Sequence, residues 1–119
     1  MYKLEISIPH IPPALNRTLR MHYHKRHKIY QEWYGMMRSK IKEKPSKPLE
    51  LYTLTITRCY YRQLDFDGLV GSYKPVADAL KMHNVILDDR YCCSGPWVVT
   101  QEFRSKNLKG LTKIMVEER

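Results

Sequence analysis

The sequence lacks any hydrophobic run near the roughly 20 residues that a membrane-spanning helix needs. Its first ten residues, MYKLEISIPH, alternate and carry charge, which argues against a secretory signal peptide. We therefore expect a soluble cytoplasmic protein with no membrane partner.

Cysteine is also scarce. The chain has three, of which Cys92 and Cys93 are adjacent. An odd number with neighbouring members does not predict a disulfide framework. The cluster of His22, His24 and His27 suggests a zinc site, but four Lys and Arg residues beside it would oppose a cation. A solvated basic segment is the favoured interpretation of this stretch.

Acidic residues are few, twelve against 21 Lys and Arg, so the formal net charge is +9. The excess is concentrated, since residues 1–48 hold eleven Lys or Arg against three Glu and residues 49–119 are nearly balanced. A concentrated basic surface favours a polyanionic partner, of which nucleic acid is the usual case. The alternative is a surface that is basic without a specific partner.

The chain of 119 residues fits one domain, spanning 1–119, with a single core. Apolar and polar side chains alternate in four segments, which predicts strands over 2–8, 49–60, 96–104 and 110–117. The turn around Ser105–Gly110 predicts that the last two strands form a hairpin.

Two segments have apolar residues at helical spacing and predict helices over 26–43 and 73–83. Ser72 is expected to cap the second helix, Pro75 to lie in its first turn, and Asn84 to end it. The order β-α-β-α-β-β predicts an α/β (α+β) fold, a two-layer single domain with a mixed four-stranded sheet.

All five aspartates fall between residues 65 and 89. Asp65 and Asp67 follow the second strand, and their side chains share a face if the chain is still extended there. Asp78 lies on the second helix, and Asp88 and Asp89 come just after it. Carboxylates are the ligands that Mg²⁺ or Mn²⁺ prefers. Such ions can neutralise the charge that builds up during phosphodiester hydrolysis.

Lys74 lies four residues before Asp78, so a helix places both on one face, where the lysine could stabilise a phosphate. Purely structural interpretations stay open. The Asp-x-Asp segment beside a glycine is also typical of a turn. Lys74 and Asp78 could form a surface pair worth about 0.3–0.5 kcal/mol, and Asp88 and Asp89 could cap the segment that follows.

Several motifs together resemble those of RusA-type Holliday junction resolvases. The family pattern has Asp-x-Asp-Asn-Leu, a lysine four residues before the aspartate of Asp-Ala-Leu, and Asp-Asp ending eleven residues later. The matching segments are Asp65-Phe66-Asp67-Gly68-Leu69, Lys74-Pro75-Val76-Ala77-Asp78-Ala79-Leu80 and Ile86-Leu87-Asp88-Asp89. Nearer the start, Pro12-Pro13-Ala14-Leu15-Asn16-Arg17 is similar to the family's Pro-Pro-Ser-x-Asn-Arg segment.

The resemblance implies a homodimeric endonuclease that cuts four-way DNA junctions with Mg²⁺, for which Mn²⁺ can substitute. Asp65, Asp67 and Asp89 match the family's catalytic, metal-binding aspartates. Lys74 matches its essential lysine, and Asp78 matches a helix aspartate that we add to the expected metal ligands. A two-fold dimer would supply one site for each of the two strands that must be cut.

The chain departs from the family pattern at two places. Gly68 stands where the family usually has Asn, so any contact of that amide is missing. Three extra residues separate Asp67 from Lys74, and the lysine is therefore assigned by counting back from Asp78. Counting forward from Asp67 gives Gly71, which has no side chain to act.

Basic and aromatic residues outside the motifs fit the same activity. The expected phosphate contacts are Arg17, Arg20, Lys25, Arg26 and Arg62. Phe66 could stack at the open centre of a junction, or instead pack in the core. A nuclease for forks or flaps and a protein that binds junctions without cutting them are the alternative functions.

Overall fold

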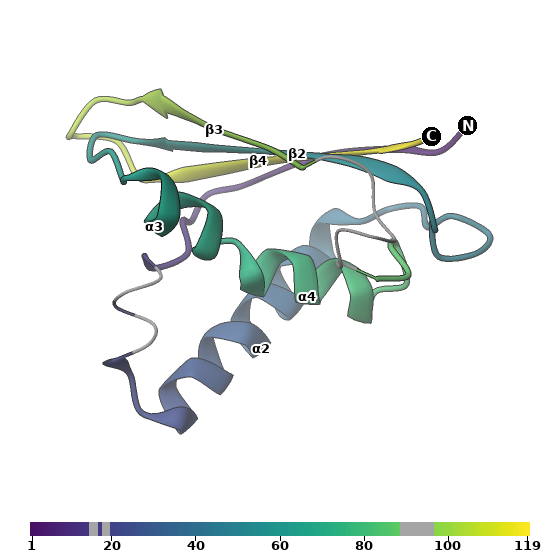
Figure 1. Ribbon diagram of the computed structural model, residues 1–119, viewed down its shortest axis with the longest axis horizontal. Helices are drawn as coiled ribbons and strands as arrows, with labels where there is room; N and C mark the ends of the chain where they lie inside the picture. Colours follow the sequence, from purple (N-terminus) through teal and green to yellow (C-terminus); the bar gives the residue numbers. More distant parts are fainter. Residues whose placement is uncertain (15–16, 18–19, 89–96) are drawn as a thin grey trace.

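The computed structural model describes residues 1–14, 17, 20–88 and 97–119. Its elements, in chain order, are β1 (Lys3–Ile8), α2 (Tyr23–Lys40), β2 (Tyr52–Tyr60), α3 (Phe66–Gly71), α4 (Lys74–Met82), β3 (Trp97–Phe103) and β4 (Leu111–Glu118). The strands form one mixed sheet and the labelled helices lie on one side of it (Figure 1), which confirms the predicted two-layer architecture. No helix in the described part of the chain has the length and apolar character needed to cross a bilayer.

The order of strands across the sheet is β1-β4-β2-β3. β4 pairs antiparallel with both β1 and β2, whereas β3 pairs parallel with β2. The predicted hairpin of the last two strands is therefore wrong, because β2 lies between them. A parallel neighbour requires a crossover, and the segment containing α3 and α4 makes it, taking β3 to the edge of the sheet.

The core lies between the sheet and the helices. β2 and β4 supply fully buried aliphatic side chains, and α2 packs Trp33 and Met37 against them. α4 contributes Val76 and Leu80, both with no exposed surface. These helices also contact each other, so the apolar faces predicted from helical spacing are shared between sheet and neighbouring helix.

The boundaries of the helices differ from the prediction for local reasons. α2 begins three residues early because the Nδ1 of His22 accepts a hydrogen bond from the His24 backbone. Ser72 does not cap α4, since its hydroxyl donates to the Leu69 carbonyl and ends α3 instead. Pro75 does lie in the first turn of α4. Asn84, with φ of 61°, takes the left-handed conformation just after that helix.

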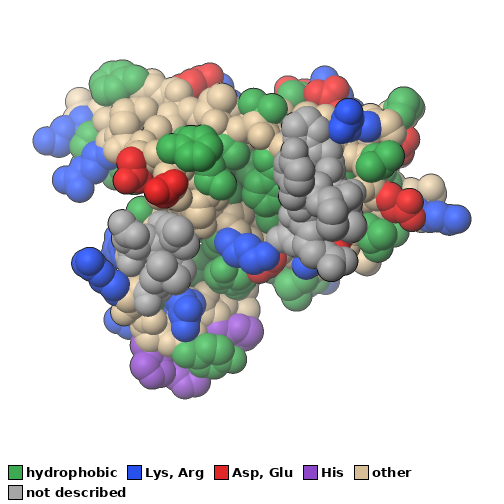
Figure 2. All heavy atoms as spheres, in the orientation of Figure 1, with side chains coloured by type: hydrophobic (Ala, Val, Ile, Leu, Met, Phe, Trp, Pro, Cys, Tyr) green, Lys and Arg blue, Asp and Glu red, His purple; other side chains and the backbone are tan. Residues whose placement is uncertain are grey.

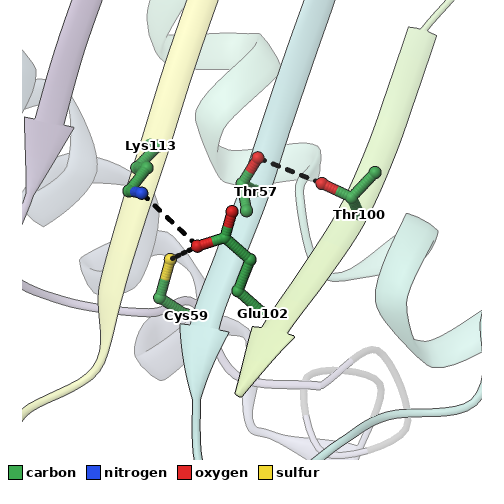
Figure 3. A network of polar contacts seen from close by, with 5 residues as sticks. All are labelled: Thr57, Cys59, Thr100, Glu102 and Lys113. Carbon is green, nitrogen blue, oxygen red and sulfur yellow. Dashed lines mark hydrogen bonds and ion pairs between the residues drawn. The ribbon is translucent and has the colours of Figure 1, made fainter. Parts of the chain in front are cut away.

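The face of the sheet opposite the helices carries a polar network (Figure 3). The Thr57 and Thr100 hydroxyls lie 3.0 Å apart across β2 and β3, and Lys113 of β4 pairs with Glu102 at 3.4 Å. The buried Cys59 thiol donates to the same carboxylate. Burial raises the pKa of Cys59, and Glu102 raises it further. A neutral, hydrogen-bonded thiol is suited to structure rather than to nucleophilic chemistry.

Two buried polar residues, Arg58 of β2 and Tyr73 between α3 and α4, lie within electrostatic range of each other. Only 5% of Arg58 is exposed. Its guanidinium donates a hydrogen bond to the Pro12 carbonyl at 3.2 Å and lies over the Tyr60 ring. Burial lowers the pKa of Arg58, while nearby Tyr73 and Tyr60 act in the opposite direction. The Tyr73 hydroxyl is fully buried and has no hydrogen-bond partner within the described ranges.

We predict that Tyr73→Phe leaves the free energy of unfolding unchanged or raises it by about 1 kcal/mol, because an unpaired buried hydroxyl is lost. Burial raises the pKa of Tyr73 above its ordinary value near 10. Above that pH the unfolded chain loses the proton before the folded one does, so wild-type stability should fall as pH rises. Urea unfolding between pH 8 and 11 should show a shallower fall in the variant.

The control is Tyr23→Phe, which changes a hydroxyl on a side chain that is 62% exposed. It should match the wild type at every pH. If Tyr73→Phe instead lowers the free energy of unfolding by more than about 1 kcal/mol at neutral pH, the Tyr73 hydroxyl makes a hydrogen bond that the described residues do not show.

Candidate functional site

The chain leaves β2 at Tyr60 and is held again four residues later by a side chain of β3. The Gln101 amide donates to the Leu64 carbonyl at 2.9 Å and accepts from the Leu64 N–H at 2.8 Å. It thereby satisfies both backbone groups of the residue immediately before Asp65. Gln101 was not among the predicted site residues, because only the pairing of β2 with β3 brings it there.

Asp65 is the N-cap of α3 rather than the end of a strand. Its backbone is extended, and its Oδ1 accepts a hydrogen bond from the Gly68 N–H at 2.9 Å. Asp67 lies within the first turn of the helix, and both aspartates are exposed. The expected extended segment and loop are thus replaced by a short helix that begins directly after Asp65.

Gly68 allows the Asp65 carboxylate to close over the start of α3. A Cβ atom at this position would lie 2.7 Å from Asp65 Oδ1, closer than such contacts occur. With a side chain here, the Asp65 carboxylate would have to shift, which strains its cap bond to the Gly68 N–H. Glycine, where RusA-type resolvases usually have Asn, therefore suits the capped conformation of Asp65.

Lys74 and Asp78 form an ion pair on α4, with Nζ and Oδ1 3.2 Å apart. The Lys74 side chain is 53% exposed and that of Asp78 is 26% exposed. The predicted sharing of one helix face is confirmed. The Lys74 side chain thus reaches solvent, while the Asp78 carboxylate is largely covered.

The middle of α2 faces this ion pair. Burial raises the pKa of Tyr30, the Asp78 carboxylate raises it further, and Lys74 and Arg26 act in the opposite direction. These charges therefore lie within electrostatic range of the Tyr30 hydroxyl. Tyr30 was not predicted as a site residue, since its helical spacing alone gives no sign that α4 lies alongside.

The predicted metal ligands are only partly described. Asp65, Asp67 and Asp78 lie on α3 and α4, whereas Asp89 falls outside the described residues. Among the residues that are described, no three His, Cys, Asp or Glu side chains gather closely enough to hold a metal ion. The backbone carbonyl of Asp88 accepts a hydrogen bond from the buried Tyr52 hydroxyl, which anchors the chain just before Asp89.

The predicted phosphate contacts lie on the surface. Figure 2 shows Lys, Arg and His side chains gathered over the end of the molecule where α2 begins. Of the predicted residues, Arg17, Arg20, Lys25 and Arg62 are exposed, and Arg26 is partly buried. The Arg62 guanidinium lies 5.6 Å from the centroid of the Tyr61 ring. Phe66 is 75% exposed, which excludes the alternative that it packs in the core.

The histidines near the start of α2 are arranged as stacked rings. Those of His22 and His24 have centroids 5.0 Å apart, and Tyr23 stacks on His27 at 6.2 Å. They are not part of any metal-binding group that the described ranges contain. Cys92 and Cys93 lie outside the described residues.

No family model matches the chain, and no curated protein matches it either. The resemblance to RusA-type resolvases therefore rests on the motifs themselves. Of these, the Pro12 segment is tied to β2 through Arg58, while the Asp65 and Lys74 motifs lie on the crossover.

We predict that Gly68→Ala and Gly35→Ala will differ in stability by up to about 1 kcal/mol. Gly35 lies exposed within α2 with open space around its Cβ position, so alanine should stabilise that helix by about 0.5–1 kcal/mol. At Gly68 the same gain is offset by weakening of the Asp65 cap, which is worth about 1 kcal/mol when intact. Denaturant unfolding of the two variants measures the difference, and equal stabilisation would contradict the clash.

Proposed function

We propose that the protein is a metal-dependent endonuclease that resolves Holliday junctions as a homodimer. The observation that carries the proposal is the Lys74–Asp78 ion pair on α4, which follows the Asp65-x-Asp67 segment on the next helix at the spacing of the family motif. Its lysine is 53% exposed, whereas its carboxylate is only 26% exposed. A DNA substrate also fits the expected cytoplasmic location and the net charge of +9.

The donor set suits a hard divalent cation such as Mg²⁺, or Mn²⁺ in its place. Asp65 and Asp67 offer exposed carboxylates at the start of α3, and one cap bond leaves Asp65 a second oxygen. Together with Asp89, and with Asp78 beside them, they are the proposed ligands. When bound, the ion would neutralise charge on the phosphate and activate water.

The chain's own side chains would bind and orient the DNA. The Lys74 ammonium can donate to a phosphate oxygen once a substrate competes with Asp78 for it. The exposed cations near the start of α2, together with Arg62, would hold the phosphate backbone. Phe66, with three quarters of its surface exposed, can stack on a base at the open centre of the junction.

We predict that the wild-type protein makes paired, symmetric nicks in a synthetic four-way junction in Mg²⁺, and that Asp67→Asn makes none. The variant should bind the junction at least as tightly, because a negative charge near the phosphate is removed. Gel analysis of products and a binding titration in Ca²⁺ measure both effects. Glu50→Gln, which removes the same charge from an exposed position before β2, should cut at the wild-type rate.

Full cleavage by Asp67→Asn would contradict the metal site. Nicking of forks or flaps but not of four-way junctions would support the alternative nuclease. Tight junction binding with no product, even in Mn²⁺, would identify a protein that binds junctions without cutting.

We predict that Lys74→Met lowers junction cleavage at least a hundredfold, the scale of a lost transition-state donor. Its free energy of unfolding should change by no more than about 1 kcal/mol, since the Lys74 side chain is 53% exposed. Single-turnover cleavage and urea unfolding separate the two effects. Lys106→Met, at an exposed turn before β4, serves as the control and should leave both unchanged. Unimpaired cleavage by Lys74→Met would show that the ion pair is only structural.

A further inference from the structure

A groove of about 670 Å³ lies between α2 and α4, next to the Lys74–Asp78 pair. Tyr30 and Tyr34 line it from α2, and Asp78, Lys81 and Met82 line it from α4. Its volume lies in the range of pockets that take small organic groups. The two tyrosines are four residues apart, so their rings follow one another along the same face of the helix.

The ring of Tyr34 is held in place from within the fold. It stacks on His83 with centroids 4.2 Å apart and planes inclined by 5°. His83 is 2% exposed, and its Nε2 lies 2.9 Å from the Tyr34 backbone carbonyl. A ring fixed in this way is a preorganised surface, because little side-chain entropy remains to be lost when a ligand stacks beside it.

The charges around the groove are mainly positive. Lys81 lies in its wall, and both Lys74 and Arg26 act on the Tyr30 hydroxyl, whereas Asp78 is the carboxylate that acts on it among the described residues. Aromatic rings bordered by cations suit a nucleotide, whose base can stack while its phosphate meets an ammonium or guanidinium group. An apolar helix from another protein would instead bury these charged side chains away from water.

We propose that this groove binds one unpaired nucleotide of the DNA strand, with its base against Tyr30 and Tyr34. The inference rests on the proposed function, because it places this nucleotide next to the phosphate that Lys74 would contact. The groove then explains a preference for branched DNA, since a paired base in a continuous duplex cannot enter it without being unstacked.

The test combines a change in the groove with a change in the DNA. A four-way junction carries 2-aminopurine at each unpaired position near its centre in turn, and binding is followed in Ca²⁺. Its fluorescence should be quenched at one position by wild type and by Tyr30→Phe, which keeps the ring. Tyr30→Leu should abolish the quenching and weaken binding about tenfold, in line with loss of one stacked base.

An abasic site at the same DNA position should weaken wild-type binding by a similar factor. The abasic site should not weaken binding by Tyr30→Leu any further, because the base and the Tyr30 ring contribute to binding through the same contact. The matched control is Tyr23→Leu, the same substitution at an exposed position of the same helix outside the groove. It should keep the quenching. Circular dichroism checks that each variant is folded, and Lys81→Glu provides a second groove variant that should also weaken binding.

Three results would overturn the proposal. Quenching by Tyr30→Leu and Lys81→Glu equal to wild type would show that no base enters the groove. If Tyr23→Leu loses as much quenching and affinity as Tyr30→Leu, the DNA contacts α2 along its length rather than at the groove. Dissociation of a dimer by Tyr30→Leu in sedimentation, with quenching unchanged, would make the groove a contact between two copies of the chain. Because these readouts are made without cleavage, wild-type protein that binds the base but never cuts would refute the proposed nuclease and leave the groove standing.

Discussion

The parallel pairing of β2 with β3 is the constraint on which the rest of this structure depends. Two parallel neighbours run in the same direction, so the chain must travel back along the sheet between them. The segment with α3 and α4 forms this crossover, and it contains Asp65, Lys74 and Asp78. The same pairing brings Gln101 beside Leu64 and fixes the point at which the crossover begins.

Side-chain periodicity was enough to predict all four strands and both long helices, because burial of one face dictates the pattern. It could not predict which strands pair, and β3 and β4 were wrongly joined as a hairpin. The helix α3 was missed because FDGLVG is short and contains two glycines. Its formation depends on the cap from Asp65 and on the clamp at Leu64, which is made by a residue 37 positions away.

The candidate site divides in a similar way. Motif spacing proposed Asp65, Asp67, Lys74 and Asp78 as site residues, and the helical interval correctly predicted that the last two would meet. Spacing gave no sign of Tyr30, whose relation to Asp78 depends on the packing of α2 against α4. Asp65 and Lys74 are held in different ways. A hydrogen bond from the backbone orients the Asp65 carboxylate, whereas the Lys74 side chain reaches the surface from its pair with Asp78.

The position of β4 has a consequence for how the chain folds. Among the described strands, β4 follows the others in sequence but lies between β1 and β2, and it is the strand with which β1 pairs. During synthesis more than a hundred residues are added after β1 before β4 can pair with it, and until then no sheet covers the apolar side chains of β1. Such long-range closure predicts slow folding compared with helical proteins of this size. The centre of the sheet is completed only at the end.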